Sequence, residues 1–385
     1  MSRILILDSG TQGYITVQSL KKAGHTVNLL YRSRHNYADD SKYLDWKYRT
    51  EFTHESNEYL ELVKKIIEER QIEVVIPMSD FSSMFLSRNK KELKSLVKYD
   101  LPDIDVFEQG YDKNSLMALC AKNGYPHPQT INDVTDVSGL DKENLHFPLL
   151  IKPNHTCGGR GMTLARNCEE LVEKFPKIYR QYGDCHLQEY IPQGGAQVEV
   201  QLYINEHKEL VESSVIYKYR WYPENGGSSC CATAVKNDEV VDICYRLLKD
   251  IGWVGFADFD TIEDPRTGEL LIMELNPRVP ACVKAVVKSG TDWPNIIVNE
   301  YLGETYQRKD FRPGVLLKHL GMELLWFFYS KNRFKTKPSL FKVYGKNVYY
   351  QDLDWRDPMP FIKGTWHNFK QQLNPSFRKS KSGTR

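Results

Sequence analysis

The chain has 385 residues, of which 41% are hydrophobic and 26% charged, and its formal net charge is +2. This length exceeds what one ordinary hydrophobic core organises, so two or three packed units are expected. A charge so close to zero disfavours a general nucleic-acid-binding surface, and no nucleic-acid partner is expected.

The start of the chain and its cysteines point to a cytoplasmic location. The first apolar run is interrupted at Asp8, which is unlike a signal peptide. Eight cysteines are present without a CxxC pair, a pattern typical of a reduced compartment.

The first 110 residues alternate apolar strands with helices. Strands are predicted at 3–7, 26–30 and 73–77, with a helix over roughly 55–70. This alternation indicates a parallel α/β sheet. The segment Gly10-x-x-Gly13 after the first strand lacks the full GxGxxG pattern, and this disfavours dinucleotide binding.

From residue 111 the pattern changes to longer strands and a glycine-rich loop. Helices are predicted over 112–123, 168–182 and 239–251, and strands at 148–153, 185–191, 198–205, 212–219, 255–262 and 269–278. The loop CGGRG, at 157–161, follows the strand that carries Lys152.

The segment IMELNPR holds the most informative residues. Glu274 and Asn276 are two positions apart on a predicted strand, so their side chains lie on one face, which Arg278 continues. Neighbouring carboxylate and amide oxygens suit Mg²⁺ that is shared with nucleotide phosphates. Asp258, on the strand expected to pair with this one, is a further candidate ligand. Taken alone, the pattern fits a solvated strand face equally well.

Cations and glycines upstream suit phosphate. Lys152 closes a rigid strand just before Gly158, Gly159 and Gly161, whose backbone amides can approach an anion closely. Lys113 is an additional cation about 40 residues earlier. The simpler alternatives are an ordinary turn and a surface lysine.

Lys218 and Arg220 alternate with aromatic residues in the segment YKYRWYPENGG. On a regular strand both side chains point into one cleft, where they are predicted to bind a substrate carboxylate or the γ-phosphate of the nucleotide. The alternative is a half-exposed strand followed by a glycine-rich turn.

The order of these elements resembles the ATP-grasp superfamily, over roughly residues 1–310. The resemblance rests on Lys113, Lys152, the CGGRG loop, QEYI at 188–191, Asp258 and the ExNxR pattern of 274–278. It implies an α/β (α+β) ATP-grasp fold preceded by a Rossmann-like domain. The expected organisation is a pre-ATP-grasp domain at 1–110, an ATP-grasp domain at 111–310 and an extension at 311–385. The ATP-grasp domain would have a small lobe over about 113–188 and a large lobe over about 189–310.

The resemblance also implies roles for individual residues. Lys113 and Lys152 would hold the phosphates of ATP, under the glycine-rich loop. The adenine would lie against Glu189, Tyr190 and Ile191. Asp258, Glu274 and Asn276 would bind Mg²⁺, with Mn²⁺ as an alternative. Arg278 would act in catalysis together with Lys152.

The ribose position departs from the family pattern. The family often has a glutamate where this chain has Gln197, and Glu199 lies two residues further on. Either side chain is a candidate for the ribose contact.

By resemblance to the carboxylate–amine ligase branch, including proteins like D-aspartate ligase and carbamoyl-phosphate synthase, an ATP-dependent ligase is expected. It would activate a small-molecule carboxylate as an acyl phosphate and join it to an amine. The alternatives are a bicarbonate-activating enzyme and a nucleotide-binding regulatory protein without catalysis.

The C-terminal segment is basic and aromatic. Residues 331–385 contain 13 Lys/Arg, 3 Asp and 10 aromatic residues, and a helix is predicted over 316–328. Such a segment can pack on the rest of the protein, or can bring 316–385 into peripheral contact with the inner face of a membrane. A homodimer is also compatible with the sequence.

Overall fold

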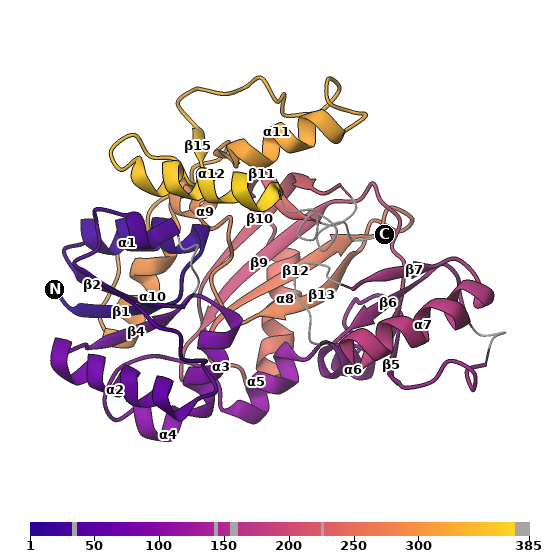
Figure 1. Ribbon diagram of the computed structural model, residues 1–385, viewed down its shortest axis with the longest axis horizontal. Coiled ribbons are helices and arrows are strands. Elements are labelled where there is room, and N and C mark those ends of the chain that lie inside the picture. Colours follow the sequence, from indigo (N-terminus) through magenta and orange to yellow (C-terminus); the bar gives the residue numbers. More distant parts are fainter. Residues whose placement is uncertain (33–36, 142–144, 155–160, 225–226, 374–385) are drawn as a thin grey trace.

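The computed structural model of the protein describes residues 1–32, 37–141, 145–154, 161–224 and 227–373. Helices and three β-sheets alternate through these ranges, which confirms the predicted mixed α/β class (Figure 1). The large sheet occupies the centre, with the N-terminal sheet on one side of it and a smaller sheet on the other.

The N-terminal sheet is parallel and has the strand order β3-β2-β1-β4. Its central strands are apolar and buried, as expected where helices cover both faces of a parallel sheet. The strands are β1 (Arg3–Leu7), β2 (Thr26–Tyr31), β3 (Trp46–Arg49) and β4 (Val74–Pro77). The helices of this part are α1 (Thr11–Lys22), η1 (Tyr37–Asp40), α2 (Asn57–Arg70), α3 (Asp80–Arg88), α4 (Lys90–Leu93) and α5 (Ile104–Tyr111).

Helix α3 begins directly after β4 because Ser79 caps it. The Ser79 side chain accepts a hydrogen bond from the Ser82 backbone N–H, and the Ser82 side chain accepts one from the Ser79 backbone N–H. This capping box places Asp80 in the first turn of α3, at the carboxyl end of the parallel sheet.

The small sheet has the order β5-β8-β6-β7 and its own core. Asp112 caps α6, whose first residue is Lys113. The elements of this part are α6 (Lys113–Asn123), β5 (Thr130–Val134), β6 (Leu149–Pro153), β7 (Thr163–Ala165), α7 (Cys168–Tyr182) and β8 (Cys185–Glu189).

The large sheet has the order β13-β12-β9-β10-β11-β14-β15. One face packs on α8, while the other packs on α9 and on the N-terminal part. Its strands are β9 (Gln197–Ile204), β10 (Leu210–Tyr222), β11 (Ser228–Val235), β12 (Gly255–Glu263), β13 (Leu270–Asn276), β14 (Leu316–Lys318) and β15 (Val348–Tyr350). The helices beside it are α8 (Asp238–Ile251), α9 (Lys284–Ser289) and α10 (Trp293–Leu302).

The C-terminal part is joined to this sheet. Residues 316–318, predicted to begin a helix, are a strand instead, because β14 is buried between β11 and β15; the helix α11 starts later (Leu320–Tyr329). The last described helix, α12 (Met359–Gln372), packs on η1. Within the described residues, no helix has the length and apolar character needed to cross a bilayer.

Candidate active site

The β12–β13 hairpin brings carboxylates together on one face of the large sheet. Its antiparallel register sets Asp260 opposite Glu274 and Asp258 opposite Asn276. The Asn276 amide lies 3.4 Å from Asp260 Oδ2. Sequence reasoning missed Asp260, although it lies two residues after Asp258 and so shares its face. The register of the hairpin, once known, singles out Asp260 as the partner of Glu274.

Asp258 has a different environment from the one predicted for a metal ligand. It is almost fully buried, and the Gln201 side-chain amide donates to its Oδ1 at 2.8 Å. Burial and the negative charge of Glu199 raise the pKa of Asp258 well above its usual range. Asp260 faces Glu274 and keeps 30% of its side chain exposed, so it is better placed than the buried Asp258 to reach a metal, and it joins the candidate set. The role of Asp258 as a metal ligand stays a prediction.

Lys113 reaches Glu274 from the start of α6. The distance from Lys113 Nζ to Glu274 Oε2 is 3.5 Å. Burial alone would raise the pKa of Glu274, but Lys113, a hydrogen bond with Asp260, and the charges of Lys152 and Arg278 outweigh it and lower this pKa to about 2. Glu274 is therefore ionised at every physiological pH.

Lys152 is buried in the small sheet and donates from Nζ to Gln188 Oε1 at 2.8 Å. Across the sheet it pairs with His186, whose Nδ1 lies 2.8 Å from Asn154 Oδ1. Burial, together with the charges of Lys152 and Lys113, lowers the pKa of His186 to about 2, so this ring is neutral. Both lysines therefore lie near His186.

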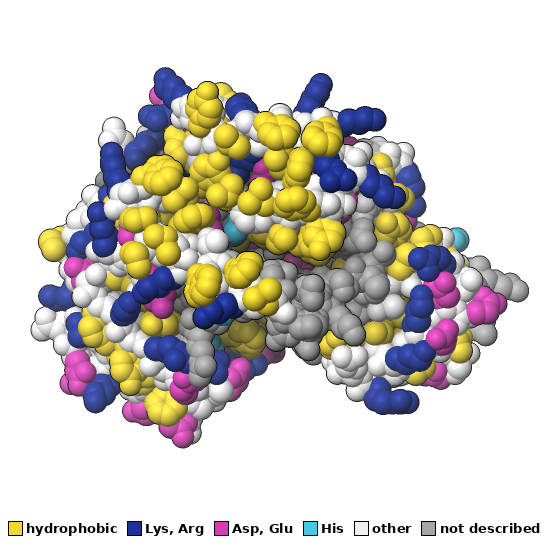
Figure 2. Space-filling model, turned by 45° about the horizontal axis from the view of Figure 1, so that its top comes forward, with side chains coloured by type: hydrophobic (Ala, Val, Ile, Leu, Met, Phe, Trp, Pro, Cys, Tyr) yellow, Lys and Arg dark blue, Asp and Glu magenta, His cyan; other side chains and the backbone are white. Residues whose placement is uncertain are grey.

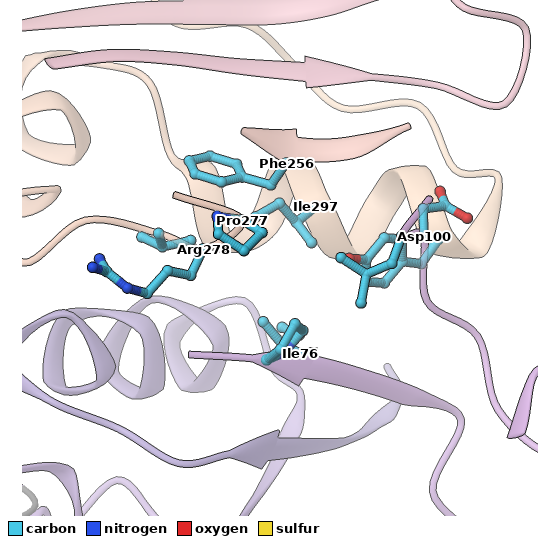
Figure 3. A pocket seen from close by; sticks show the side chains of 10 residues that line it. Ile76, Asp100, Phe256, Pro277, Arg278 and Ile297 are labelled. Atoms are coloured by element: carbon cyan, nitrogen blue, oxygen red, sulfur yellow. The ribbon is translucent and has the colours of Figure 1, made fainter. Parts of the chain in front are cut away.

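Arg278 connects this region to the N-terminal part. Its Nε lies 2.8 Å from Asp80 Oδ1, and its NH2 lies 3.3 Å from Asn276 Oδ1. Behind it, a void of about 10 Å³ is lined mostly by apolar side chains, together with Asp100 and Arg278 itself, and is too small for a substrate. Figure 3 shows the guanidinium of Arg278 extending away from this void. Asp80 was not among the predicted site residues.

Lys218 lies beside the carboxylates, held between two of them. Its Nζ is 2.7 Å from Glu199 Oε1 and 2.7 Å from Asp260 Oδ1. The thiol of Cys282 donates to the other Glu199 oxygen at 2.7 Å. Glu199 is therefore engaged with Lys218 and Cys282, which disfavours its predicted contact with ribose; Gln197, at the start of β9, is half-buried.

Arg220 does not share the cleft predicted for it and Lys218. Lys218 pairs with Ala232, but a β-bulge then pairs Arg220 with Cys231, which lies on the opposite face of β11. Arg220 is 2% exposed and forms two bonds to Glu323, with Nε–Oε1 at 2.7 Å and NH2–Oε2 at 3.0 Å. The prediction of Arg220 as a substrate ligand is wrong, because this side chain is part of a buried ion pair.

The predicted nucleotide contacts are described only in part. Gly158 and Gly159 lie outside the described residues. Gly161 has φ +77, and a Cβ there would meet the Tyr182 ring at 2.8 Å, so this position requires glycine.

The segment predicted to bind adenine follows β8. The backbone N–H groups of Glu189 and Tyr190 donate to the carbonyls of Gln129 and Pro148 at 2.8 and 3.2 Å. A nucleotide base held by this segment would therefore use other groups, such as the backbone at Ile191.

The donor set of Asp260, Glu274 and Asn276 fits Mg²⁺. Magnesium in proteins takes one or two carboxylates and completes its shell with water and phosphate oxygens. Among the described residues there is no group of three or more His, Cys, Asp or Glu side chains that could hold a metal alone. Asp260, Glu274 and Asn276 leave room in such a shell for nucleotide phosphates.

Two lysines, three oxygen-donor side chains and an arginine gather at one sheet face, as in a site of the ATP-grasp type. The family model described as an ATP-grasp domain matches residues 111–282. This part of the chain is an ATP-grasp domain, and the predicted family resemblance is confirmed.

Curated relatives of the chain are ligases and synthases. It is 23% identical over 330 residues to the carbamoyl phosphate synthase large chain of Thermotoga maritima, covering 74% of this chain and 26% of that protein. It is 22% identical over 242 residues to the D-aspartate ligase of Enterococcus faecium, covering 57% and 58%. The chain spans only part of the length of these relatives.

Solved structures share the fold. The biotin carboxylase domain of 2-oxoglutarate carboxylase from Hydrogenobacter thermophilus, determined as a dimer with MgADP and bicarbonate, has a TM-score of 0.67 at 19% identity, covering 82% of this chain and 73% of that one. The L-amino acid ligase of Bacillus licheniformis has a TM-score of 0.63 at 15% identity, covering 82% and 78%. The ATP-grasp fold predicted from the sequence is confirmed.

Proposed function

We propose that the protein is an ATP-dependent carboxylate–amine ligase. It activates a carboxylate as an acyl phosphate, forms an amide with an amino acid or another amine, and releases ADP and phosphate. The observation that carries the proposal is the convergence of Lys113, Asp260, Glu274 and Arg278 on one face of the large sheet. The relationship to D-aspartate ligase supports the choice of an amine as the acceptor.

In the first step a carboxylate oxygen of the substrate attacks the γ-phosphorus of ATP, and the bond to ADP breaks. Negative charge then moves onto the β-phosphate. Lys113 and Lys152, which act on one region from two elements, neutralise this charge. Positioning and charge neutralisation are most of what phosphoryl transfer requires, so no nucleophilic side chain is needed.

In the second step the amine nitrogen attacks the acyl carbon, the bond from carbon to phosphate breaks, and the amine loses a proton. Arg278 is held beside Asn276 and Asp80, where its fixed charge favours the tetrahedral oxyanion and the departing phosphate. Lys218 has three N–H donors, two of which face Glu199 and Asp260. We assign the third donor to the substrate carboxylate.

Asp260, Glu274 and Asn276 would hold Mg²⁺, with Mn²⁺ as a substitute, and the metal would supply charge neutralisation at the phosphates. A cytoplasmic location and a homodimer are further proposals; the former rests on the cysteine pattern and the latter on the dimeric 2-oxoglutarate carboxylase domain.

A bicarbonate-activating enzyme is the second candidate. It is favoured by the similarity to carbamoyl phosphate synthase and by the structure of the carboxylase domain with bicarbonate. The two candidates differ in the carboxylate that they activate.

A screen of phosphate release tests the proposal. The enzyme, ATP and Mg²⁺ are supplied with amino acids and small carboxylates, each with and without amines, and with bicarbonate in a separate arm. Release that needs both a carboxylate and an amine is expected, and Glu274→Gln should abolish it. Release that needs bicarbonate alone favours the second candidate. The folded protein should also melt at higher temperature with ATP and Mg²⁺; no release in any arm and no such rise would overturn both.

A further inference from the structure

The C-terminal part carries a surface that the ligase reaction does not use. Exposed apolar side chains gather on α11, on α12 and on the segments between them, and Figure 2 shows them across one face, with Lys and Arg around them. We call this surface the basic aromatic face. It comprises Leu324, Phe328, Tyr329, Phe334, Phe341, Val343, Tyr344, Trp355, Ile362, Trp366, Phe369 and Leu373.

Helix α12 presents its apolar stripe outward. Ile362, Trp366 and Phe369 recur at intervals of three or four residues, so they lie along one side of the helix, and Leu373, directly after the helix, continues the series. They are 53–65% exposed. The stripe of an ordinary surface helix faces the core, and here it faces out.

The other side of α12 is fixed to the N-terminal part. Asn368 donates to the Tyr37 hydroxyl at 2.5 Å. Gly364 lies against the same ring, where a Cβ would come within 2.2 Å of a ring carbon. These contacts hold the opposite side of α12 against Tyr37, so the fold directs the apolar stripe outward.

Helix α11 is anchored in a similar way. Glu323 accepts from Arg220 on β10 and lies 2.8 Å from Lys318 on β14, so its carboxylate is buried between two cations. Its neighbours Leu324 and Phe328 are 48% and 68% exposed. The basic aromatic face is thus tied to both the large sheet and the N-terminal part.

Cationic and acidic side chains of the C-terminal part differ in exposure. Nine cationic residues lie between 331 and 373: Lys331, Arg333, Lys335, Lys337, Lys342, Lys346, Arg356, Lys363 and Lys370. Of the three acidic residues of this range, Asp352 and Asp357 are buried, and Asp354 is half-buried and accepts from Gln18 at 2.6 Å. The exposed charge of the described part of this range is therefore predominantly positive.

We propose that the basic aromatic face docks on an anionic membrane surface. Aromatic rings settle at the level of lipid headgroups, aliphatic side chains enter the acyl boundary, and Lys and Arg bind acidic headgroups. The contact is peripheral, because no helix among the described residues is long and apolar enough to cross a bilayer.

Two other occupants fit less well. A second copy, bound through the same face about a two-fold axis, would set these cations against themselves, and protein interface cores are depleted of lysine. A single-stranded nucleic acid stacks on aromatic rings, but Leu324, Val343, Ile362 and Leu373 offer no ring for stacking.

Sedimentation of the full chain with vesicles tests the proposal. Vesicles of phosphatidylcholine with about one-third phosphatidylserine should carry the protein down, whereas phosphatidylcholine alone should not, and added salt should weaken the binding. Reversing four exposed lysines together (Lys335, Lys337, Lys342 and Lys346 to Glu) should lower the partition coefficient at least about tenfold. Replacing Phe328, Tyr344 and Trp366 by Ser should lower it by a similar factor.

Control variants outside the basic aromatic face test whether vesicle binding depends on this face or only on the net charge and exposed apolar area of the whole protein. Lys91→Glu with Lys122→Glu, and Tyr48→Ser with Phe52→Ser, change exposed residues outside the face and should leave sedimentation unchanged. ATP-dependent thermal stabilisation of each variant reports that it is folded.

Failure to sediment with acidic vesicles would overturn the proposal, whether or not the ligase reaction is found. The proposal would also be overturned if the protein did not bind vesicles but formed a dimer that the triple Ser variant dissociates. Tighter binding to single-stranded DNA than to acidic vesicles would overturn it as well.

Discussion

Asp80 and Arg278 form an ion pair between the N-terminal part and the ATP-grasp domain, with 2.8 Å between Oδ1 and Nε. The contact joins the first turn of α3 to the residues that follow β13. The interaction between Asp80 Oδ1 and Arg278 Nε is electrostatic, without the geometry of a hydrogen bond, and Asp80 Oδ1 is buried. We therefore propose that Asp80 positions Arg278.

Asp80→Asn should lower kcat about tenfold, because Arg278 loses the charge that holds it in place. The KM for ATP should change by less than about twofold, since the phosphate-binding lysines lie on other elements. Steady-state kinetics measure both values. Asp103→Asn, which alters an ion pair with Lys90 in the same part of the chain, is the control and should leave kcat unchanged. Equal effects from both variants would contradict the role of Asp80.

The two aspartates of β12 should differ sharply. Asp260→Asn removes a charged ligand candidate opposite Glu274, and kcat should fall at least about 100-fold with a higher Mg²⁺ requirement. Asp258→Asn changes a buried carboxyl whose pKa is raised, and the amide oxygen can still accept from Gln201, so kcat should fall less than about threefold.

Titration of activity with Mg²⁺ measures this difference. A larger loss from Asp258→Asn than from Asp260→Asn would favour the assignment of Asp258 as the metal ligand.

The strands and helices near the site were predictable because their apolar patterns are regular. The strand at 3–7 and the helix at 168–182 have the predicted bounds, and the β12–β13 hairpin follows from the spacing of its strands. The face shared by Glu274 and Asn276 follows from strand alternation alone.

Long-range contacts were the part that sequence could not supply. The bulge after Lys218 turns Arg220 to the other side of the sheet, and no local signal announces it. The strand at 316–318 is apolar enough for either a helix or a strand, and its neighbours β11 and β15 decide between them. Likewise, the pairing of Asp80 with Arg278 spans about 200 residues.

The buried pair of Arg220 and Glu323 should be important for stability and not for substrate binding. Arg220→Ala leaves Glu323 buried with Lys318 as its remaining cation, and the free energy of unfolding should fall by about 3–5 kcal/mol. Urea denaturation measures this change. Arg220→Met with Glu323→Leu and Lys318→Met should recover much of the loss, because none of the three charges is then buried without its partner. A rise in substrate KM without loss of stability in Arg220→Ala would instead make Arg220 a ligand.

Lys284 should make stability depend on pH. It is buried at the start of α9, and its Nζ donates to the carbonyls of Tyr350 and Leu353 at 2.5 and 3.4 Å. Burial, reinforced by the charge of Lys288, lowers the pKa of Lys284 from 10.5 to about 8. Between these values the unfolded chain keeps a proton that the folded protein loses, so this residue makes stability rise as pH increases from about 8 to 10.

Below pH 8 the ammonium is charged in both states, and burying it costs about 3 kcal/mol relative to the neutral amine. Lys284→Met removes this cost and also removes the two hydrogen bonds. The free energy lost with those bonds is similar at every pH. The difference in unfolding free energy, Met variant minus wild type, should therefore be about 2 kcal/mol more positive at pH 7 than at pH 9.5. Urea denaturation at both pH values measures it, and the exposed Lys65→Met should show no such change. An equal difference at the two pH values would mean that Lys284 keeps an ordinary pKa, and that its bonds to the C-terminal carbonyls compensate for its burial.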